Sequence, residues 1–221
     1  MATQSSIGMR RPSTGTMLNW MFAPLREHRR AWLGVNLLYF GTIALGMLAV
    51  LVYPALQQSL WQSVGQAFSP TSTLGPLAQA YTEGRLLMAI ALTFVVNLVL
   101  GSLAVLSLPS LVIPFAGILM GVFRALLWGV LFSPFGGEMQ LGLLPHALTV
   151  LLEGEAYVVA MLGVWLWWWP VLRTPGKRWQ LWRDGLVLQG RIYCLVALLL
   201  AIAAVYEALE VILLLPRLLA P

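Results

Sequence analysis

Long apolar runs dominate this sequence and decide what it can fold into. A helix needs about 20 apolar residues to cross the hydrocarbon core of a bilayer, because lipid offers no partner for unpaired backbone groups. The runs show no alternating period, so helices are favoured over strands. The mean hydropathy of +0.84 and the 10% of charged residues exclude a soluble domain of this length. The sequence therefore predicts an all-α, polytopic membrane helix bundle.

The apolar runs divide the chain into about five predicted transmembrane helices. Prolines lie at or near the ends of the runs, where a missing N–H costs little. We expect a basic cytoplasmic segment over residues 1–30, including a short interfacial helix near 12–24, and a single transmembrane domain over 31–221. The predicted spans cover about 31–54, 86–107, 110–132, 144–170 and 190–215, and residues 55–83 form an external loop.

Basic residues gather in two groups that predict the orientation of the chain. Cytoplasmic loops carry an excess of Lys and Arg, and five spans place both groups inside when the N-terminus is cytoplasmic. The C-terminus is then extracytoplasmic, and the 55–83 loop, which has no Lys or Arg, faces outward. Arg10, Arg11, Arg26, Arg29 and Arg30 precede the first span, whereas Arg173, Lys177, Arg178, Arg183 and Arg191 lie between the fourth and fifth spans or open the fifth.

The net charge, the missing motifs and the single cysteine limit the classes of function that fit this sequence. A net charge of +5 on a multi-pass cell-membrane protein is explained by topology and anionic lipid, so no nucleic-acid partner is expected. The sequence has no phosphate-binding glycine loop and no zinc-ligand spacing, so we predict no catalytic, cofactor-binding or metal-binding residues and no enzyme activity. The lone Cys194 excludes an intramolecular disulfide. The N-terminus does not resemble a cleaved signal peptide, so the first span is expected to remain as an anchor.

Two carboxylates interrupt the fourth span, and helical geometry separates them. At 100° per residue, Glu153 shares a face with His146 and Tyr157, whereas Glu155 points the opposite way. A catalytic pair on this helix is therefore not expected. Glu155 has no partner that the sequence identifies.

Other polar residues reach a similar predicted depth in the membrane. We predict that Glu153 neutralises Arg124 inside the bundle, that Glu207 or Glu210 competes for it, and that His146 caps the group near the outer interface. A purely structural ion pair, a histidine hydrogen-bonded to interfacial water and glutamates that simply reach the interface are the alternatives. The predicted intramembrane polar cluster comprises Asn97, Arg124, His146, Glu153 and Glu207.

Small residues recur every four positions in the third predicted span. Such a ridge lets another helix approach closely, and plain helix packing is a commoner use of it than an oligomer contact. The predicted helix-packing ridge comprises Gly117, Gly121, Ala125 and Gly129.

Several short motifs together resemble the stage II sporulation protein M family of membrane proteins. The matching stretches are the basic "LREHRRAWLGVNLLYF" before the first span, Asn97 in "FVVNLVLG", the glycines of "FAGILMGVFRALLWG", "LLPHAL" with "EGEAYVVAMLG", and "AVYEALEVILLLP" with Glu207. The chain departs from the family pattern after His146: Ala147 replaces a usual Gly, and Glu153 comes one helical turn later than usual. The resemblance implies a cell-envelope membrane function, with sporulation as the founding context.

Two functions follow as expectations. The first is a non-enzymatic scaffold of this family's type, which recruits cell-envelope or peptidoglycan-remodelling proteins through its external loop. The second is a permease-like subunit of a transport complex that is driven by a separate cytoplasmic ATPase and needs a homodimer to enclose a pathway. An intramembrane hydrolase using His146 and Glu153 is the least favoured alternative, because no nucleophile or metal-ligand set accompanies them. The lipid bilayer is a partner in every case.

Overall fold

The computed structural model of the protein describes residues 14–135 and 143–218, and every regular element in these ranges is helical. Arg10 and Arg11 of the predicted basic segment lie outside the described residues. In the first half of the chain the elements are α1 (Thr14–Glu27), α2 (Arg29–Val52), α3 (Ala55–Ala67), α4 (Gly75–Thr82), α5 (Leu86–Val95) and the π-helix η1 (Val96–Ser107). The second half contains the 3₁₀ turn η2 (Pro109–Leu111), α6 (Ala116–Leu131), α7 (Leu143–Arg173), α8 (Arg178–Leu209), the π-helix η3 (Glu210–Leu214) and α9 (Leu215–Leu218).

Four helical stretches are long and apolar enough to cross a membrane, so the prediction of an all-α membrane bundle is confirmed. They are Arg29–Val52, Leu86–Leu111, Pro145–Arg173 and Arg178–Leu218. The apolar helix Ala116–Leu131 is shorter. It covers most of the third predicted span, which was expected to begin at residue 110. It starts late because the chain turns at Pro114, and Phe115 takes a left-handed φ of 59° immediately before the helix.

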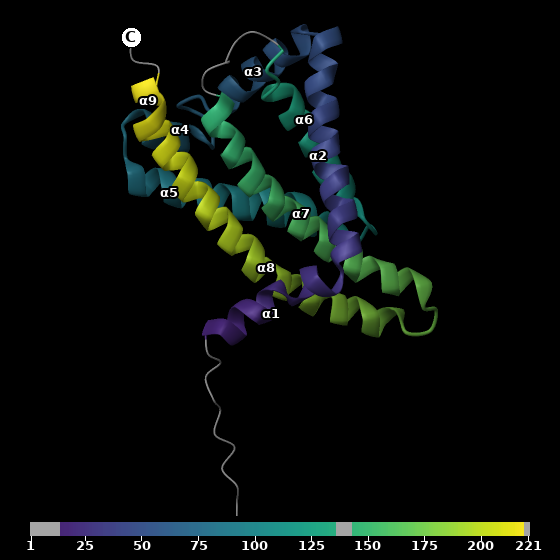
Figure 1. Ribbon diagram of the computed structural model, residues 1–221. Helices are drawn as coiled ribbons and strands as arrows, with labels where there is room; N and C mark the ends of the chain where they lie inside the picture. Colours follow the sequence, from purple (N-terminus) through teal and green to yellow (C-terminus); the bar gives the residue numbers. More distant parts are fainter. Residues whose placement is uncertain (1–13, 136–142, 219–221) are drawn as a thin grey trace, which may run out of the picture.

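α7 forms the centre of the bundle. The run from Ala156 to Leu162 is fully buried, because α8 packs along one side of α7 while α2 and α6 pack on another. Figure 1 shows α7 passing between α2 and α8. The hydrophobic core is therefore organised around the helix that carries both Glu153 and Glu155.

The two ends of the bundle differ. Figure 1 shows α1 and the turn between α7 and α8 at its lower end, and α3, α4 and α9 at its upper end. Among the described residues, the basic side chains of the two predicted cytoplasmic groups belong to the lower elements, which include Arg26, Arg29 and Lys177. Both groups therefore lie on one side of the bundle, as the charge pattern requires.

Two segments predicted as loops contain helices. The 55–83 segment folds into α3 and α4, and Gln57 anchors α3 by donating to the carbonyls of Leu131 at 3.1 Å and Ser133 at 2.8 Å. The basic stretch after Arg173 is a short turn, in which Gly176 takes a φ of +91°, followed at once by α8. Hydropathy underestimates such helices because their polar faces lower the average of the window.

Candidate functional site

A cavity of about 630 Å³ lies inside the upper half of the bundle. α3 and α4 form one wall, and α5, η1, α6, α7 and the end of α8 form the rest. Most of the wall is apolar, but several polar side chains also line it. They are Tyr81, Thr93, Asn97, Arg124, His146, Thr149, Glu153 and Glu207. All the residues of the predicted polar cluster therefore line one cavity.

A chain of hydrogen bonds links three helices on one side of the cavity. Arg124 Nη2 on α6 donates to the Tyr157 hydroxyl at 2.9 Å. Tyr157 donates to Asn97 Oδ1 on η1 at 3.1 Å, and Asn97 Nδ2 donates to Glu153 Oε1 at 2.5 Å. Every link runs from donor to acceptor toward Glu153, so the cation at one end is connected to the carboxyl at the other through two neutral groups.

The expected direct ion pair between Arg124 and Glu153 is wrong. No salt bridge joins them among the described residues, because Tyr157 and Asn97 stand between the two groups. The Arg124 guanidinium instead lies over two aromatic rings, 4.3 Å from the Tyr157 centroid and 4.9 Å from the Trp128 centroid. Aromatic faces stabilise a desolvated cation, so α6 can hold a charge without a carboxylate in contact.

Glu153 and Glu207 approach each other across the cavity from α7 and α8. Glu153 is only 3% exposed. Glu207 also lies near the Tyr81 hydroxyl on α4, which donates to or accepts from Thr93 at 2.8 Å. The cavity thus offers carboxyl, hydroxyl, amide and guanidinium groups to anything that enters it.

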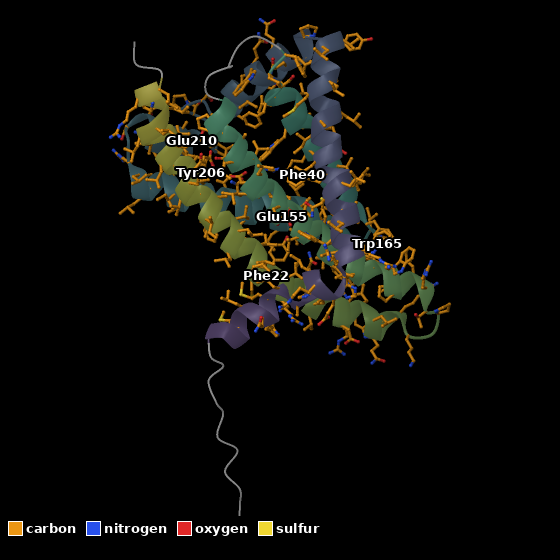
Figure 2. The ribbon with its side chains drawn as sticks, in the orientation of Figure 1. Phe22, Phe40, Glu155, Trp165, Tyr206 and Glu210 are labelled. Carbon is orange, nitrogen blue, oxygen red and sulfur yellow. The ribbon has the colours of Figure 1, made fainter. Side chains whose placement is uncertain are left out.

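His146 has a side-chain partner that the sequence did not identify. Its Nδ1 lies 3.2 Å from Glu210 Oε1, and Thr149 donates to the other oxygen of that carboxylate at 2.8 Å. Both oxygens of Glu210 are therefore hydrogen-bonded to side chains of α7, and Glu210 does not compete for Arg124. Figure 2 shows Glu210 and Tyr206 toward the α9 end of the bundle, where Tyr206 donates to the Pro145 carbonyl at 3.0 Å.

The π-helix η1 positions the amide of Asn97 and lets Arg124 approach. Such helices are rare beyond a single turn and frequently lie at functional sites. Gly101, one turn after Asn97, leaves room for its neighbours: a Cβ there would meet the Tyr157 hydroxyl at 2.9 Å and Arg124 Nη1 at 3.3 Å. Only a glycine fits this contact without displacing the hydrogen-bond chain.

A second polar group lies farther along η1 and was missed by sequence reasoning. Ser102 and Ser107 both hydrogen-bond to the Tyr193 hydroxyl on α8, at 3.0 and 2.7 Å, and Gln189 donates to Ser107 at 3.0 Å. Asn97, Ser102 and Ser107 are spaced by five residues, and the i to i+5 hydrogen bonding of a π-helix brings side chains at this spacing closer in direction than an α-helix does. The five-residue spacing was the signal in the sequence.

The small-residue ridge of α6 lies at close helix contacts on several sides. A Cβ at Gly129 would collide with the Ile43 carbonyl of α2, and one at Gly121 would collide with the Met161 sulfur of α7. Gly117 approaches the Leu106 carbonyl of η1 in the same way, and Ala125 is fully buried. The ridge therefore contacts helices within this chain.

Glu155 lies on the far side of α7 from the cavity and has a partner that the sequence did not reveal. Trp32 in α2 donates its indole N–H to Glu155 Oε1 at 2.6 Å. Glu153 and Glu155, the two carboxyl groups of the fourth predicted span, thus serve different regions of the protein. In Figure 2, Glu155 lies between Phe40 and Phe22, well below Glu210.

Within the described residues, no group of three or more His, Cys, Asp or Glu side chains is arranged to hold a metal ion. No protein-family model matches the sequence, and neither a curated protein nor a solved structure matches it.

Proposed function

We propose that this chain is a permease-like membrane subunit that binds a small polar solute in the cavity and works with a separate cytoplasmic ATPase. The observation that carries the proposal is the cavity itself. Polar side chains inside a bilayer are expensive, and they gather where they serve a substrate or ion pathway. Asn97, Glu153 and Glu207 gather in this way.

The polar residues of η1 extend the proposed route beyond the cavity. From Asn97 to Ser107, polar side chains face the bundle interior and meet partners on α7 and α8. A smaller pocket of about 420 Å³, which includes Ser107, Gln189 and Tyr193, opens between η1 and α8 on the side of the α7–α8 turn.

The orientation completes the proposal. With the N-terminus cytoplasmic, the basic turn between α7 and α8 faces the ATPase, and the cavity lies toward the extracytoplasmic side, beside α3 and α4. The positive-inside rule supports this orientation, and so does the attraction of basic side chains to the anionic lipids of the cytoplasmic leaflet. A homodimer supplies the additional helices that a complete pathway requires.

Cysteine labelling tests the cavity directly. In a Cys194→Ser background, a Val96→Cys variant places a single thiol on the cavity wall, and a Leu37→Cys variant places one on a lipid-facing side chain that is 77% exposed. We expect a charged, membrane-impermeant thiol reagent to label Val96→Cys from the extracytoplasmic side and to spare Leu37→Cys. An unlabelled Val96→Cys would show that aqueous solutes do not reach the cavity.

The ATPase requires a separate measurement. The full chain is purified gently from its native membrane, and co-purifying proteins are quantified by mass spectrometry. A stoichiometric cytoplasmic ATPase whose hydrolysis rate changes with Glu153→Gln supports transport. If Glu153→Gln leaves both the association and the hydrolysis rate unchanged while the cavity remains accessible, the cavity has no role in driven transport.

A scaffold of the stage II sporulation protein M type is the second candidate. It is favoured by the exposed face of α3, which presents uncharged hydrogen-bonding side chains such as Gln58, Gln62 and Gln66 on a helix held in place by Gln57. A fixed surface suits the recruitment of cell-envelope or peptidoglycan-remodelling proteins. Replacing those three glutamines with Ala should abolish such recruitment without changing cavity labelling, and unchanged recruitment contradicts the scaffold.

A further inference from the structure

Glu155 opens onto a groove that is separate from the cavity. The groove has a volume of about 680 Å³ and lies between α1, α2 and α8. α1 crosses the lower part of α8, where Arg191 stacks over the Trp20 ring at 4.7 Å and donates to the Trp20 carbonyl. This contact fixes one wall of the groove at the basic end of the bundle.

The groove is apolar along its length and charged at its α1 end. The apolar lining that is accessible comes from Leu18 and Phe22 of α1 and from Leu199 of α8. Figure 2 shows Phe22 below Glu155 on this side. A lining of this kind suits an acyl chain, because one end reaches the bilayer interior and the other reaches the interface.

The charged groups of the groove have both signs. Arg26 and Arg29 are exposed at the junction of α1 and α2, whereas Glu155 is half-buried deeper in the groove. Arg29 and Trp32 are three residues apart on α2, so the guanidinium lies about one helical turn from the bond between Trp32 and Glu155. Trp32 donates to one oxygen of the Glu155 carboxylate and the Asn36 amide of α2 also lies near it, but a carboxylate has about four lone-pair sites and can accept a further donor.

This arrangement complements a headgroup with a phosphate and an ammonium a short distance apart. Arginine is the side chain best suited to phosphate oxygens, and a carboxylate binds a primary ammonium through charge-assisted hydrogen bonds. A headgroup with a phosphate and no amine leaves Glu155 facing an anion. A quaternary ammonium carries the charge but has no N–H to donate.

We propose that this groove binds one glycerophospholipid with a primary amine in its headgroup, with the phosphate on Arg26 and Arg29, the ammonium on Glu155 and an acyl chain along Leu18, Phe22 and Leu199. The site lies on the opposite side of α7 from the cavity and does not depend on the transport function. It also gives Glu155 a role that Glu153 cannot share.

Native mass spectrometry of the full chain in detergent tests the proposal. The chain is titrated separately with dioleoyl phosphatidylethanolamine, phosphatidylglycerol and phosphatidylcholine. We expect the ethanolamine lipid to bind tightest and Glu155→Gln to weaken it roughly tenfold, to the level of the choline lipid. Glu27→Gln is the matched control, because Glu27 is exposed beside Arg26 and does not line the groove.

The phosphate contact is tested in the same way. Arg29→Gln should weaken all three lipids by a similar factor, and Arg30→Gln, on the adjacent residue outside the groove, should not. Equal affinity of the unmodified chain for the three lipids, or tightest binding of phosphatidylglycerol with no effect of Glu155→Gln, overturns the proposal. The comparison on the unmodified chain decides the matter even if a variant fails to fold.

Discussion

Asn97 on η1 and Glu153 on α7 are joined by a hydrogen bond of 2.5 Å, and the same amide accepts a hydrogen bond from Tyr157 at 3.1 Å. One amide therefore uses both of its ends inside the bundle, one as donor and one as acceptor. Because it lies between the Arg124 side of the cavity and the Glu153 side, it holds together the site proposed to bind the solute.

Replacing Asn97 with Leu should destabilise the protein measurably. The substitution leaves Glu153 without its donor and Tyr157 without its acceptor in a buried environment, which costs about 1 to 3 kcal/mol. Unfolding in mixed micelles, followed by tryptophan fluorescence, measures the loss. Thr42→Val is the control, because its hydroxyl donates to the Leu38 carbonyl at an exposed position and its loss should change stability by less than about 0.5 kcal/mol. Equal effects of the two substitutions contradict the buried role of Asn97.

Replacing Gly101 with Ala should disturb the hydrogen-bond chain. The added Cβ lies 2.9 Å from the Tyr157 hydroxyl and 3.3 Å from Arg124 Nη1, so one of them must move. Overpacking of this kind costs about 1 to 3 kcal/mol. The control is Gly41→Ala, where a Cβ meets nothing within 4 Å. Thermal unfolding of both variants in the same detergent makes the comparison, and a Gly101→Ala protein as stable as Gly41→Ala argues against a tight contact.

The contact between α2 and α6 depends on glycine at a specific position. A Cβ at Gly46 would collide with the Leu126 carbonyl and lie 3.0 Å from the Gly129 Cα, and backbone atoms cannot rotate away. Gly46→Ala should therefore separate the two helices and lower the unfolding free energy by at least about 1 kcal/mol. Gly34→Ala, in the same helix with no atom within 4 Å, should be neutral or stabilising because Ala favours helix. Denaturant titration of the two variants distinguishes these outcomes.

Gln57 should control how firmly α3 covers the cavity. It is 6% exposed and donates to two carbonyls, that of Leu131 at the end of α6 and that of Ser133 just after it. Gln57→Ala removes both bonds, so hydrogen exchange of the α3 amides should accelerate by about tenfold or more. The exposed neighbour Gln58→Ala is the matched control. If exchange in α3 is the same in both variants, Gln57 is not its anchor.

Tyr81 should make stability depend on alkaline pH. Burial raises the pKa of Tyr81 above its usual value of 10.0, so the folded state keeps the proton after the unfolded chain has lost it. The unfolded state then binds fewer protons, and stability falls as pH rises above about 10, by up to about 1.4 kcal/mol per pH unit. Tyr81→Phe should remove that share of the slope. Chemical unfolding at pH 9, 10 and 11 measures it, and identical slopes contradict the assignment.

The apolar pattern predicted the membrane bundle because each span must satisfy its own backbone, whatever its neighbours are. The helical period also predicted the separation of Glu153 from Glu155, because both lie on one regular helix. The partners of these residues were not predictable in the same way. Arg124 was expected beside Glu153 because their depths matched, but depth does not reveal that Tyr157 and Asn97 would stand between them.

The sequence alone determined the class of fold, the alternation of basic and uncharged connections, and the face of α7 on which each carboxyl group lies. These features depend on local period and on transfer from water to lipid, which a single chain segment expresses by itself. Only the tertiary structure decided that η1 winds as a π-helix, that α3 and α4 fold back over a cavity, and that Trp32 meets Glu155 across 2.6 Å. Those features depend on how side chains distant in sequence fit together, because a buried polar group takes the partner that packing brings within reach.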